Sequence, residues 1–245
     1  GLEDAYTGAA MGSFAQSTAD AHGITREAMD DFAIQSLSRA KNAIEQGLLK
    51  AETAAVEIKT RRDTITVVDD EQPHKGQIDK IPSLRAAFAQ DGTITAANAS
   101  SISDGASALI LASESAVREQ GLTPMAKIVA HARSSRLPAE FTLAPVDAIT
   151  ALLNKTGWSA SDVDLWEINE AFAMVTMLAM RAHGLDHDRV NVHGGACAQG
   201  HPIGSTGSRI IVTLMHAMHH YNKQRGIAAL CIGGGEATAV AIEKC

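Results

Sequence analysis

Cysteine, aromatic residues and long apolar runs are all scarce in this chain of 245 residues. Only Cys197, Cys231 and Cys245 are present, too few and too odd in number for a disulfide framework. No apolar run approaches the roughly 18–20 residues of a membrane span, and no signal-peptide pattern opens the sequence. We therefore expect a cytoplasmic protein that does not contact a membrane.

Basic side chains are also in short supply, with 21 lysines and arginines against 28 aspartates and glutamates and a net charge of −7. This diffuse deficit argues against a nucleic-acid or anionic-membrane surface. Neither G-x-G-x-x-G nor a lysine in the Walker position accompanies Gly200, Gly204 and Gly207. Both common types of nucleotide loop are therefore disfavoured.

The first hundred residues contain one clear helix and are irregular after it. Apolar residues recur three and four apart over residues 25–46, with Thr25 as the expected N-cap and Gly47 as the expected end. Two short strands follow around a basic turn that contains Arg61. The next stretch is rich in loop-forming residues, and we place a domain boundary near Ser100.

Beyond that boundary, expected strands and helices alternate. The strands cover residues 107–113, 126–135, 164–170, 227–235 and 237–244, and the helices cover residues 115–121, 145–157, 171–184 and 204–226. This alternation is typical of a layered α/β architecture. Apolar residues make up 45% of the chain, enough to form a sizeable core.

Three junctions of this pattern carry side chains suited to acyl chemistry. Asn169 lies in NEAFA, His201 lies between Gly200 and Pro202, and Cys231 lies in CIGGG. Ligands of α/β folds usually bind at loops leaving the carboxyl ends of strands. A thiol or an imidazole moves protons near neutral pH, and an amide orients water or an oxyanion. Taken singly, Cys231 also fits an inert core residue and Asn169 fits a helix cap.

In this order the motifs resemble the C-terminal signatures of the thiolases. They are NEAFA, NVHGGACAQGHPIGSTGSR and CIGGG, preceded by DDFAIQSLSRA and TITAANASSISDGASALIL. The resemblance implies the thiolase-like layered α/β fold, of which this chain would hold the C-terminal half plus the loop domain and the tail of the N-terminal half. The corresponding divisions are a loop domain at 1–100, that tail at 101–122, and a C-terminal domain at 123–245.

The resemblance further implies a coenzyme A acyltransferase that joins or cleaves 3-ketoacyl thioesters by ping-pong chemistry. His201 would activate the nucleophile and help to stabilise the oxyanion. Asn169 would hold a water that completes the oxyanion hole, and Cys231 would take the α-proton from the second acyl-CoA. The thiolate is poised for this step if its pKa falls toward neutrality, which a nearby imidazolium or amide dipoles can achieve. Coenzyme A enters as part of the substrate, so no covalently bound cofactor and no metal is implied.

Four more positions are implied to contact the substrate. Phe172 would line the acyl pocket, Ser100 would contact the pantetheine arm, and Arg61 would meet the nucleotide end of coenzyme A. Met11 belongs to a segment in which many short-chain members have a histidine where this chain has Ala10. The preferred acyl chain therefore stays unassigned.

The family's acyl-carrying cysteine, in the N-terminal half, has no counterpart here. Cys197 is assigned a packing role, and Cys245 is terminal. We therefore expect a C-terminal portion of a thiolase that lacks the first half and cannot complete the cycle alone. Association as a homo-oligomer or with the missing half is also expected.

Two alternatives stay open. One is a non-catalytic thiolase-like subunit or fragment that binds coenzyme A or a partner chain through a face that the first half normally covers. The other is a metal site, because His216, His219 and His220 recur three and four apart on one expected helix. The segment HGLDHD adds His183, His187, Asp186 and Asp188. A solvated helix face explains these histidines equally well.

Overall fold

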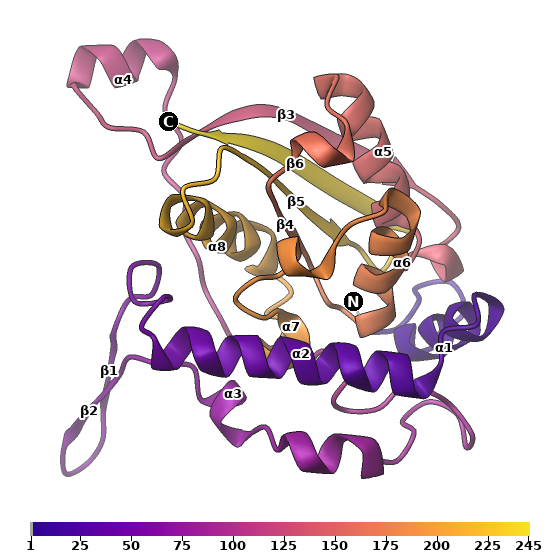
Figure 1. Cartoon of the computed structure of the whole chain (residues 1–245). Helices are drawn as coiled ribbons and strands as arrows, with labels where there is room; N and C mark the ends of the chain where they lie inside the picture. Colours follow the sequence, from indigo (N-terminus) through magenta and orange to yellow (C-terminus); the bar gives the residue numbers. More distant parts are fainter. Residues whose placement is uncertain (1) are drawn as a thin grey trace.

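The computed structural model describes residues 2–245 (Figure 1). The helices are α1 Met11–Ala21, α2 Arg26–Glu45, α3 Glu71–Lys75, α4 Glu114–Gln120, α5 Ala144–Thr156, α6 Ala173–His183, α7 Ala196–Gln199 and α8 Thr206–His220. The strands are β1 Val56–Lys59, β2 Thr64–Val67, β3 Ala126–Ser135, β4 Leu165–Ile168, β5 Arg225–Cys231 and β6 Glu236–Lys244. Short 3₁₀ turns connect several of these elements.

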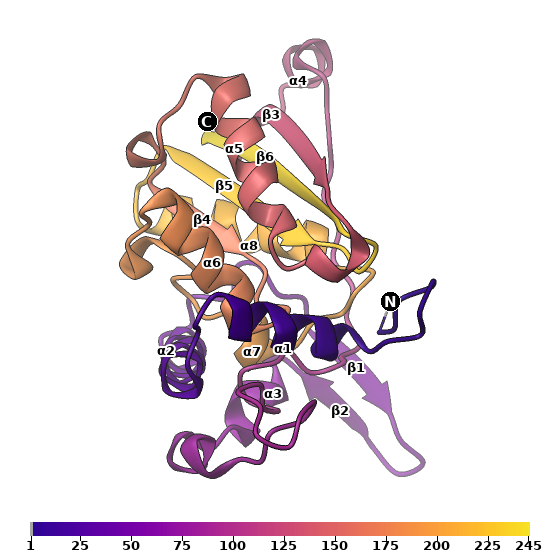
Figure 2. The same cartoon turned by 90° about the vertical axis from the view of Figure 1, so that its right-hand side faces the viewer.

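A mixed sheet with the strand order β3-β6-β5-β4 forms the centre of the C-terminal part. Strand β4 runs parallel to β5, and the other neighbours are antiparallel. Figures 1 and 2 show α5 and α6 on one face of this sheet and α8 on the other. The sheet is therefore the middle of three layers, which confirms the predicted layered α/β architecture.

Successive side chains of β5 point alternately to the two faces of the sheet. Ile227 and Ala229 pack in the core on the α5 side, whereas Ala228 and Leu230 pack against the core that contains α8. Because helices cover both faces, the strand is apolar at nearly every position. On α8, fully buried Leu214 contributes about 2 kcal/mol of hydrophobic stabilisation.

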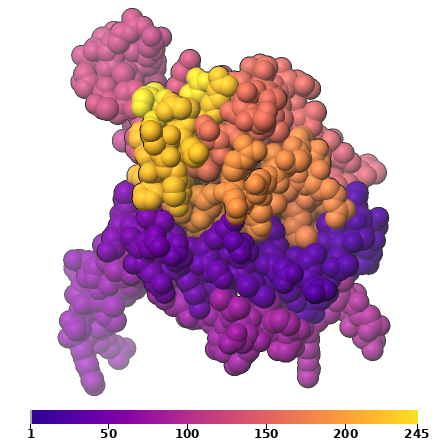
Figure 3. Space-filling model, in the orientation of Figure 1, coloured from indigo at the N-terminus to yellow at the C-terminus, as the bar shows by residue number. Residues whose placement is uncertain are grey.

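Helix α2 lies below the sheet and forms the floor of the region where strands β4 and β5 end (Figures 1 and 2). Thr25 caps it by accepting a hydrogen bond from the Ala28 N–H at 3.2 Å, as predicted. Leu37 and Ala40 of α2 pack in one cluster with Ala198 of α7. Figure 3 shows this N-terminal segment as a purple band below the orange and yellow C-terminal part.

Two predicted elements were wrong. Residues 107–113 form no strand, because no strand of the described chain lies alongside them, and Ile110 and Leu111 are 96% and 74% exposed. An apolar run favours a strand, but the ladder needs a partner. The last helix ends at His220 rather than at residue 226, because the chain reverses at Asn222 with a φ of 51° and β5 then begins.

The remaining predicted helices and strands are present, with their ends shifted by a few residues at most sites. The hairpin of β1 and β2 was also predicted; it projects from the body of the molecule in Figure 1. Among residues 2–245, no helix combines the length and the apolar character that crossing a bilayer requires. The boundaries proposed at residues 100 and 122 stay a prediction.

Candidate functional site

Asn169 and Cys231 lie at the carboxyl ends of two adjacent parallel strands. The Asn169 N–H donates to the Ala229 carbonyl oxygen at 2.9 Å, which extends the pairing of β4 with β5 by one residue. Cys231 is the last residue of β5 and is 6% exposed. The parallel register therefore brings two residues that are 62 positions apart in the sequence to one edge of the sheet.

His201 reaches the same edge from the turn between α7 and α8. Its backbone N–H donates to the Ser101 carbonyl oxygen at 3.0 Å. The preceding Gly200 has a φ of +81°, and a Cβ there would collide with the Ser103 side chain. A side chain at position 200 would therefore displace the turn that carries the imidazole.

The protonation of the His201 ring follows from its neighbour Thr206. The Thr206 hydroxyl donates to the Pro202 carbonyl oxygen at 3.0 Å, so its oxygen acts as acceptor for His201 Nδ1 at 2.7 Å. Nδ1 therefore carries the proton, and Nε2 presents a lone pair. Burial, followed by the positive charge of Arg209, lowers the pKa of His201, which keeps the ring neutral at neutral pH.

The lone pair of His201 faces the Asn169 carboxamide. Asn169 Nδ2 lies 3.5 Å from His201 Nε2, a long contact, and Asn169 Oδ1 is buried without a hydrogen-bond partner among the described residues. The side chain does not cap helix α6, whose N-cap is Phe172 and has no side-chain cap. A buried acceptor without a partner normally holds a water or a ligand.

The thiol of Cys231 is in its protonated form. Burial raises the pKa of Cys231 to about 12. The condition considered from the sequence, a pKa lowered toward neutrality by a nearby imidazolium or amide dipole, is not met in the resting site. His201 is neutral and supplies no positive charge. At neutral pH the side chain is thus a proton donor in its resting state.

An aromatic cluster adjoins these polar groups. Phe172 is 8% exposed, and its ring meets those of Phe88 and Phe141 edge to face, with centroids 6.2 and 6.3 Å apart. Met11 and Cys231 belong to the same buried cluster. Phe88 and Phe141 were missed from the sequence, because each is a single aromatic residue in a loop without a motif of its own.

Ser100 lies beside this cluster, whereas Arg61 does not. The Ser100 hydroxyl donates to the Ala171 carbonyl oxygen at 2.9 Å, and the Ser100 N–H donates to the same oxygen at 3.1 Å. Arg61 is exposed in the turn between β1 and β2, on the hairpin that projects from the molecule (Figure 1). Its contact with a nucleotide stays a prediction without support from this arrangement.

The histidines of the alternative metal site point to separate partners. His219 Nε2 lies 2.8 Å from the Met125 carbonyl oxygen, and His220 meets the Tyr221 ring edge to face. His187 stacks on Phe32 with centroids 4.7 Å apart. No group of three or more potential metal-ligating side chains occurs in residues 2–245.

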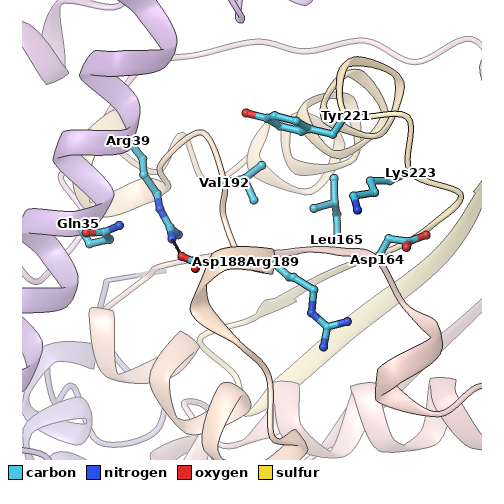
Figure 4. Close-up of a pocket in the computed structure, with 9 residues that line it drawn as sticks. All are labelled: Gln35, Arg39, Asp164, Leu165, Asp188, Arg189, Val192, Tyr221 and Lys223. Atoms are coloured by element: carbon cyan, nitrogen blue, oxygen red, sulfur yellow. Dashed lines mark hydrogen bonds and ion pairs between the residues drawn. The ribbon is translucent and has the colours of Figure 1, made fainter.

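A polar cavity of about 390 Å³ lies elsewhere, between α2 and the edge of the sheet at β4 (Figure 4). Arg39 of α2 forms an ion pair with Asp188 at 3.2 Å across it. The other residues that line it are Gln35, Asp164, Leu165, Arg189, Val192, Tyr221 and Lys223. None of them belongs to the predicted site, so this cavity is separate from it.

Two family models match this chain, one before and one after residue 120. The model described as the thiolase C-terminal domain matches residues 122–244, and the thiolase N-terminal domain matches residues 1–115. The chain belongs to the thiolase family. The expectation of a C-terminal portion alone was wrong, because residues 1–115 match the thiolase N-terminal domain. Residues 1–115 nevertheless contain no cysteine.

Individual thiolase relatives match along the whole chain. A probable acetyl-CoA acetyltransferase of Dictyostelium discoideum is 48% identical over 100% of this chain and 59% of its own length. The acetyl-CoA acetyltransferase of Bacillus anthracis superimposes with a TM-score of 0.97 at 39% identity, over 100% of this chain and 62% of that one.

A thiolase from Ascaris suum, solved in complex with coenzyme A, gives a TM-score of 0.90 at 39% identity, with coverage of 100% of this chain and 63% of that one. The chain thus spans less than two thirds of the length of these relatives. The thiolase fold is shown by these superpositions.

Proposed function

We propose that this chain supplies the acid–base and oxyanion-binding groups of a thiolase-type acyltransferase that acts on coenzyme A thioesters. One observation carries the proposal: the neutral His201 ring, oriented by Thr206, faces the Asn169 carboxamide at the edge where β5 ends in Cys231. Relatives named acetyl-CoA acetyltransferases support the same reaction class.

Each residue has a defined part in the proposed reaction. The lone pair on His201 Nε2 accepts the proton of an attacking thiol, and the resulting Nε2–H donates to the thioester oxyanion. The Asn169 Oδ1 atom accepts a hydrogen bond from a water, whose other proton is directed at that oxyanion. In the direction of cleavage, the Cys231 S–H protonates the enolate carbon; in the direction of synthesis, its thiolate takes the α-proton.

Substrate contacts form the second part of the proposal. Phe172 and Met11 border the acyl group within the aromatic cluster, and Ser100 contacts the pantetheine arm. Coenzyme A is part of the substrate, and we propose no separate cofactor. The acyl chain length is not assigned. A cytoplasmic location also stays a prediction.

The whole ping-pong cycle needs a cysteine that carries the acyl group. Residues 1–115, which match the thiolase N-terminal domain, contain no cysteine. We therefore propose that this polypeptide alone does not complete the cycle. It should nevertheless catalyse exchange of the α-protons of acetyl-CoA with solvent, because this step uses only the base and the oxyanion donors.

The exchange reaction tests the proposal. Acetyl-CoA is incubated with the chain in D₂O, and deuterium in the acetyl group is measured by mass spectrometry. We expect exchange that rises with pH, as the thiolate fraction of Cys231 grows. His201→Ala should slow it by about 100-fold to 1000-fold, the usual loss for one oxyanion donor. Cys231→Ala should abolish it, and the exposed Cys245→Ala serves as control. No exchange above a buffer blank would refute the proposal.

A second candidate is a non-catalytic subunit that binds coenzyme A or a partner chain, including another copy of itself. The extended segment that holds Ile110 and Leu111 favours it, because these side chains are largely exposed and the segment pairs with no strand of the described chain. Calorimetric titration that shows coenzyme A binding, without any proton exchange, would support this candidate over the enzyme.

A further inference from the structure

We propose that Glu170 is a positioning residue for His201: its buried carboxylate joins the end of β4, helix α2 and the loop that leads into α7. The inference deepens the proposed function and rests on it for its kinetic consequence only. Glu170 is the residue after Asn169, and it is completely buried. No step of the proposed reaction uses it.

Three donors converge on this carboxylate. Oε2 accepts from the Ser36 hydroxyl at 2.7 Å and from the Cys197 N–H at 3.0 Å. Oε1 accepts from Asn191 Nδ2 at 2.8 Å. Ser36 Oγ in turn accepts from the Gly195 N–H at 2.9 Å, so its own proton points to Glu170. Burial raises the pKa of Glu170, and the hydrogen bonds from Asn191, Ser36 and Cys197 act against this rise. Because every neighbour donates, both oxygens of the group serve as acceptors.

These contacts span long distances in the sequence and end close to His201. Ser36 lies 134 residues before Glu170, on α2. Cys197 lies in α7, the single turn of helix that is followed by Gly200 and His201. The backbone of this loop therefore depends on Glu170 for its attachment to both α2 and the end of β4.

The loop that leads into α7 packs closely against α2 and Glu170 at two glycines. A Cβ on Gly194 would lie 2.5 Å from the Ser36 carbonyl oxygen, and a Cβ on Gly195 would collide with the Glu170 carboxylate. Gly194 also has a φ of +80°. The two glycines are thus explained by close contact with the partners of Glu170.

A glutamine at position 170 cannot reproduce this pattern. Asn191 is locked, because its Oδ1 accepts from the Ile168 N–H at 2.8 Å and its Nδ2 donates to the Ile168 carbonyl oxygen at 2.9 Å. Whichever way the new side-chain amide turns, its NH₂ group faces a donor. Glu170→Gln therefore removes at least one hydrogen bond and adds a donor–donor contact at nearly constant volume.

Glu167→Gln is the matched control. Glu167 lies on β4, three residues before Glu170; it is 2% exposed, and its Oε1 atom has no partner among the described residues. The same substitution there replaces a buried carboxyl group that makes no hydrogen bond to the loop that carries His201. General effects of replacing a buried carboxyl group by an amide will therefore appear in both variants, whereas loss of His201 positioning will appear only in Glu170→Gln.

The test combines NMR with the exchange assay, using the full chain. Histidine side-chain ¹⁵N spectra report the tautomer of the His201 ring. The His201 signals are identified as those that are missing from the spectrum of His201→Ala. Backbone hydrogen exchange reports the Gly195 and Cys197 amides. We expect Glu170→Gln to shift the His201 signals and to expose both amides, and Glu167→Gln to leave them unchanged.

The kinetic readout is the exchange of the acetyl-CoA α-protons. Its kcat should fall about 100-fold in Glu170→Gln with little change in KM, because displacing a reactive group by about 1 Å has an effect of this size. Ser36→Ala removes one link and retains the Glu170 carboxyl group; it should expose the Gly195 amide and shift the His201 signals less. This second variant keeps the test valid if Glu170→Gln does not fold.

The outcomes separate the two proposals. Unchanged His201 signals in both Glu170→Gln and Ser36→Ala overturn the positioning role, even if wild-type exchange proceeds. Shifted signals without any exchange in the wild-type chain support the positioning role and refute the acyltransferase proposal. Equal effects of Glu170→Gln and Glu167→Gln on the His201 signals also overturn the positioning role.

Discussion

The buried carboxyl group of Glu167 should make this protein less stable as the pH rises. Its side chain is 2% exposed, on the face of β4 that α8 covers, and its Oε1 atom has no hydrogen-bond partner in the described chain. Burial raises the pKa of Glu167 from 4.5 to about 8, and the charge of Arg209 offsets this only in part. The folded state therefore favours the protonated form.

The sign of the effect follows from proton binding. Below pH 4.5 the carboxyl group is protonated in both states, and its contribution to stability is complete. Above that pH the unfolded chain releases its proton first, and stability falls until the folded group ionises near pH 8. At about 1.4 kcal/mol per pKa unit, the full loss is on the order of 5 kcal/mol. Roughly 2 kcal/mol of it falls between about pH 5.5 and 7.0.

Glu167→Gln removes this ionisation at nearly constant volume. We expect its free energy of unfolding to gain on that of the wild type by roughly 2 kcal/mol over the same pH interval. The measurement is urea unfolding followed by circular dichroism at several pH values, with the exposed Glu119→Gln as control. A difference between wild type and Glu167→Gln that stays constant with pH would refute the reasoning.

Two further predictions concern a glycine and the thiols. Gly194→Ala should lower the free energy of unfolding by about 2–3 kcal/mol in urea titration, because its Cβ would lie 2.5 Å from the Ser36 carbonyl oxygen. Gly184→Ala, where the added Cβ meets open space, should lower it by only about 1 kcal/mol. Equal losses in the two variants would contradict this reasoning. Exposed Cys245 should react with iodoacetamide at pH 8 at least about 100 times faster than Cys231, because burial raises the pKa of Cys231 to about 12. Mass spectrometry of the labelled peptides measures the two rates.

Local patterns were sufficient for most helices and strands. The helix from Arg26 to Glu45 was recognised from its apolar spacing and from Thr25, whose cap is made within one turn. The strand β3 has the predicted bounds, Ala126–Ser135. Residues 107–113 show the limit of such patterns, because a strand exists only if another strand lies beside it, and that depends on the rest of the fold.

The three polar residues of the candidate site were found because each follows an expected strand or precedes an expected helix. Their relation to one another was not available from that pattern. The tautomer of His201 depends on Thr206, and its neutrality depends on burial. The pKa of Cys231 is raised rather than lowered toward neutrality, because burial of the thiol outweighs the effect considered for a nearby imidazolium or amide dipole.

The sequence by itself determined the layered α/β class, the family, and the choice of Asn169, His201 and Cys231, since these follow from short motifs and periodicity. Only the tertiary structure decided which of these groups carry protons and what holds them, as Glu170 demonstrates. Its partners lie 134 and 27 residues away, and hydrogen bonding and burial depend on such spatial neighbours rather than on neighbours in the chain.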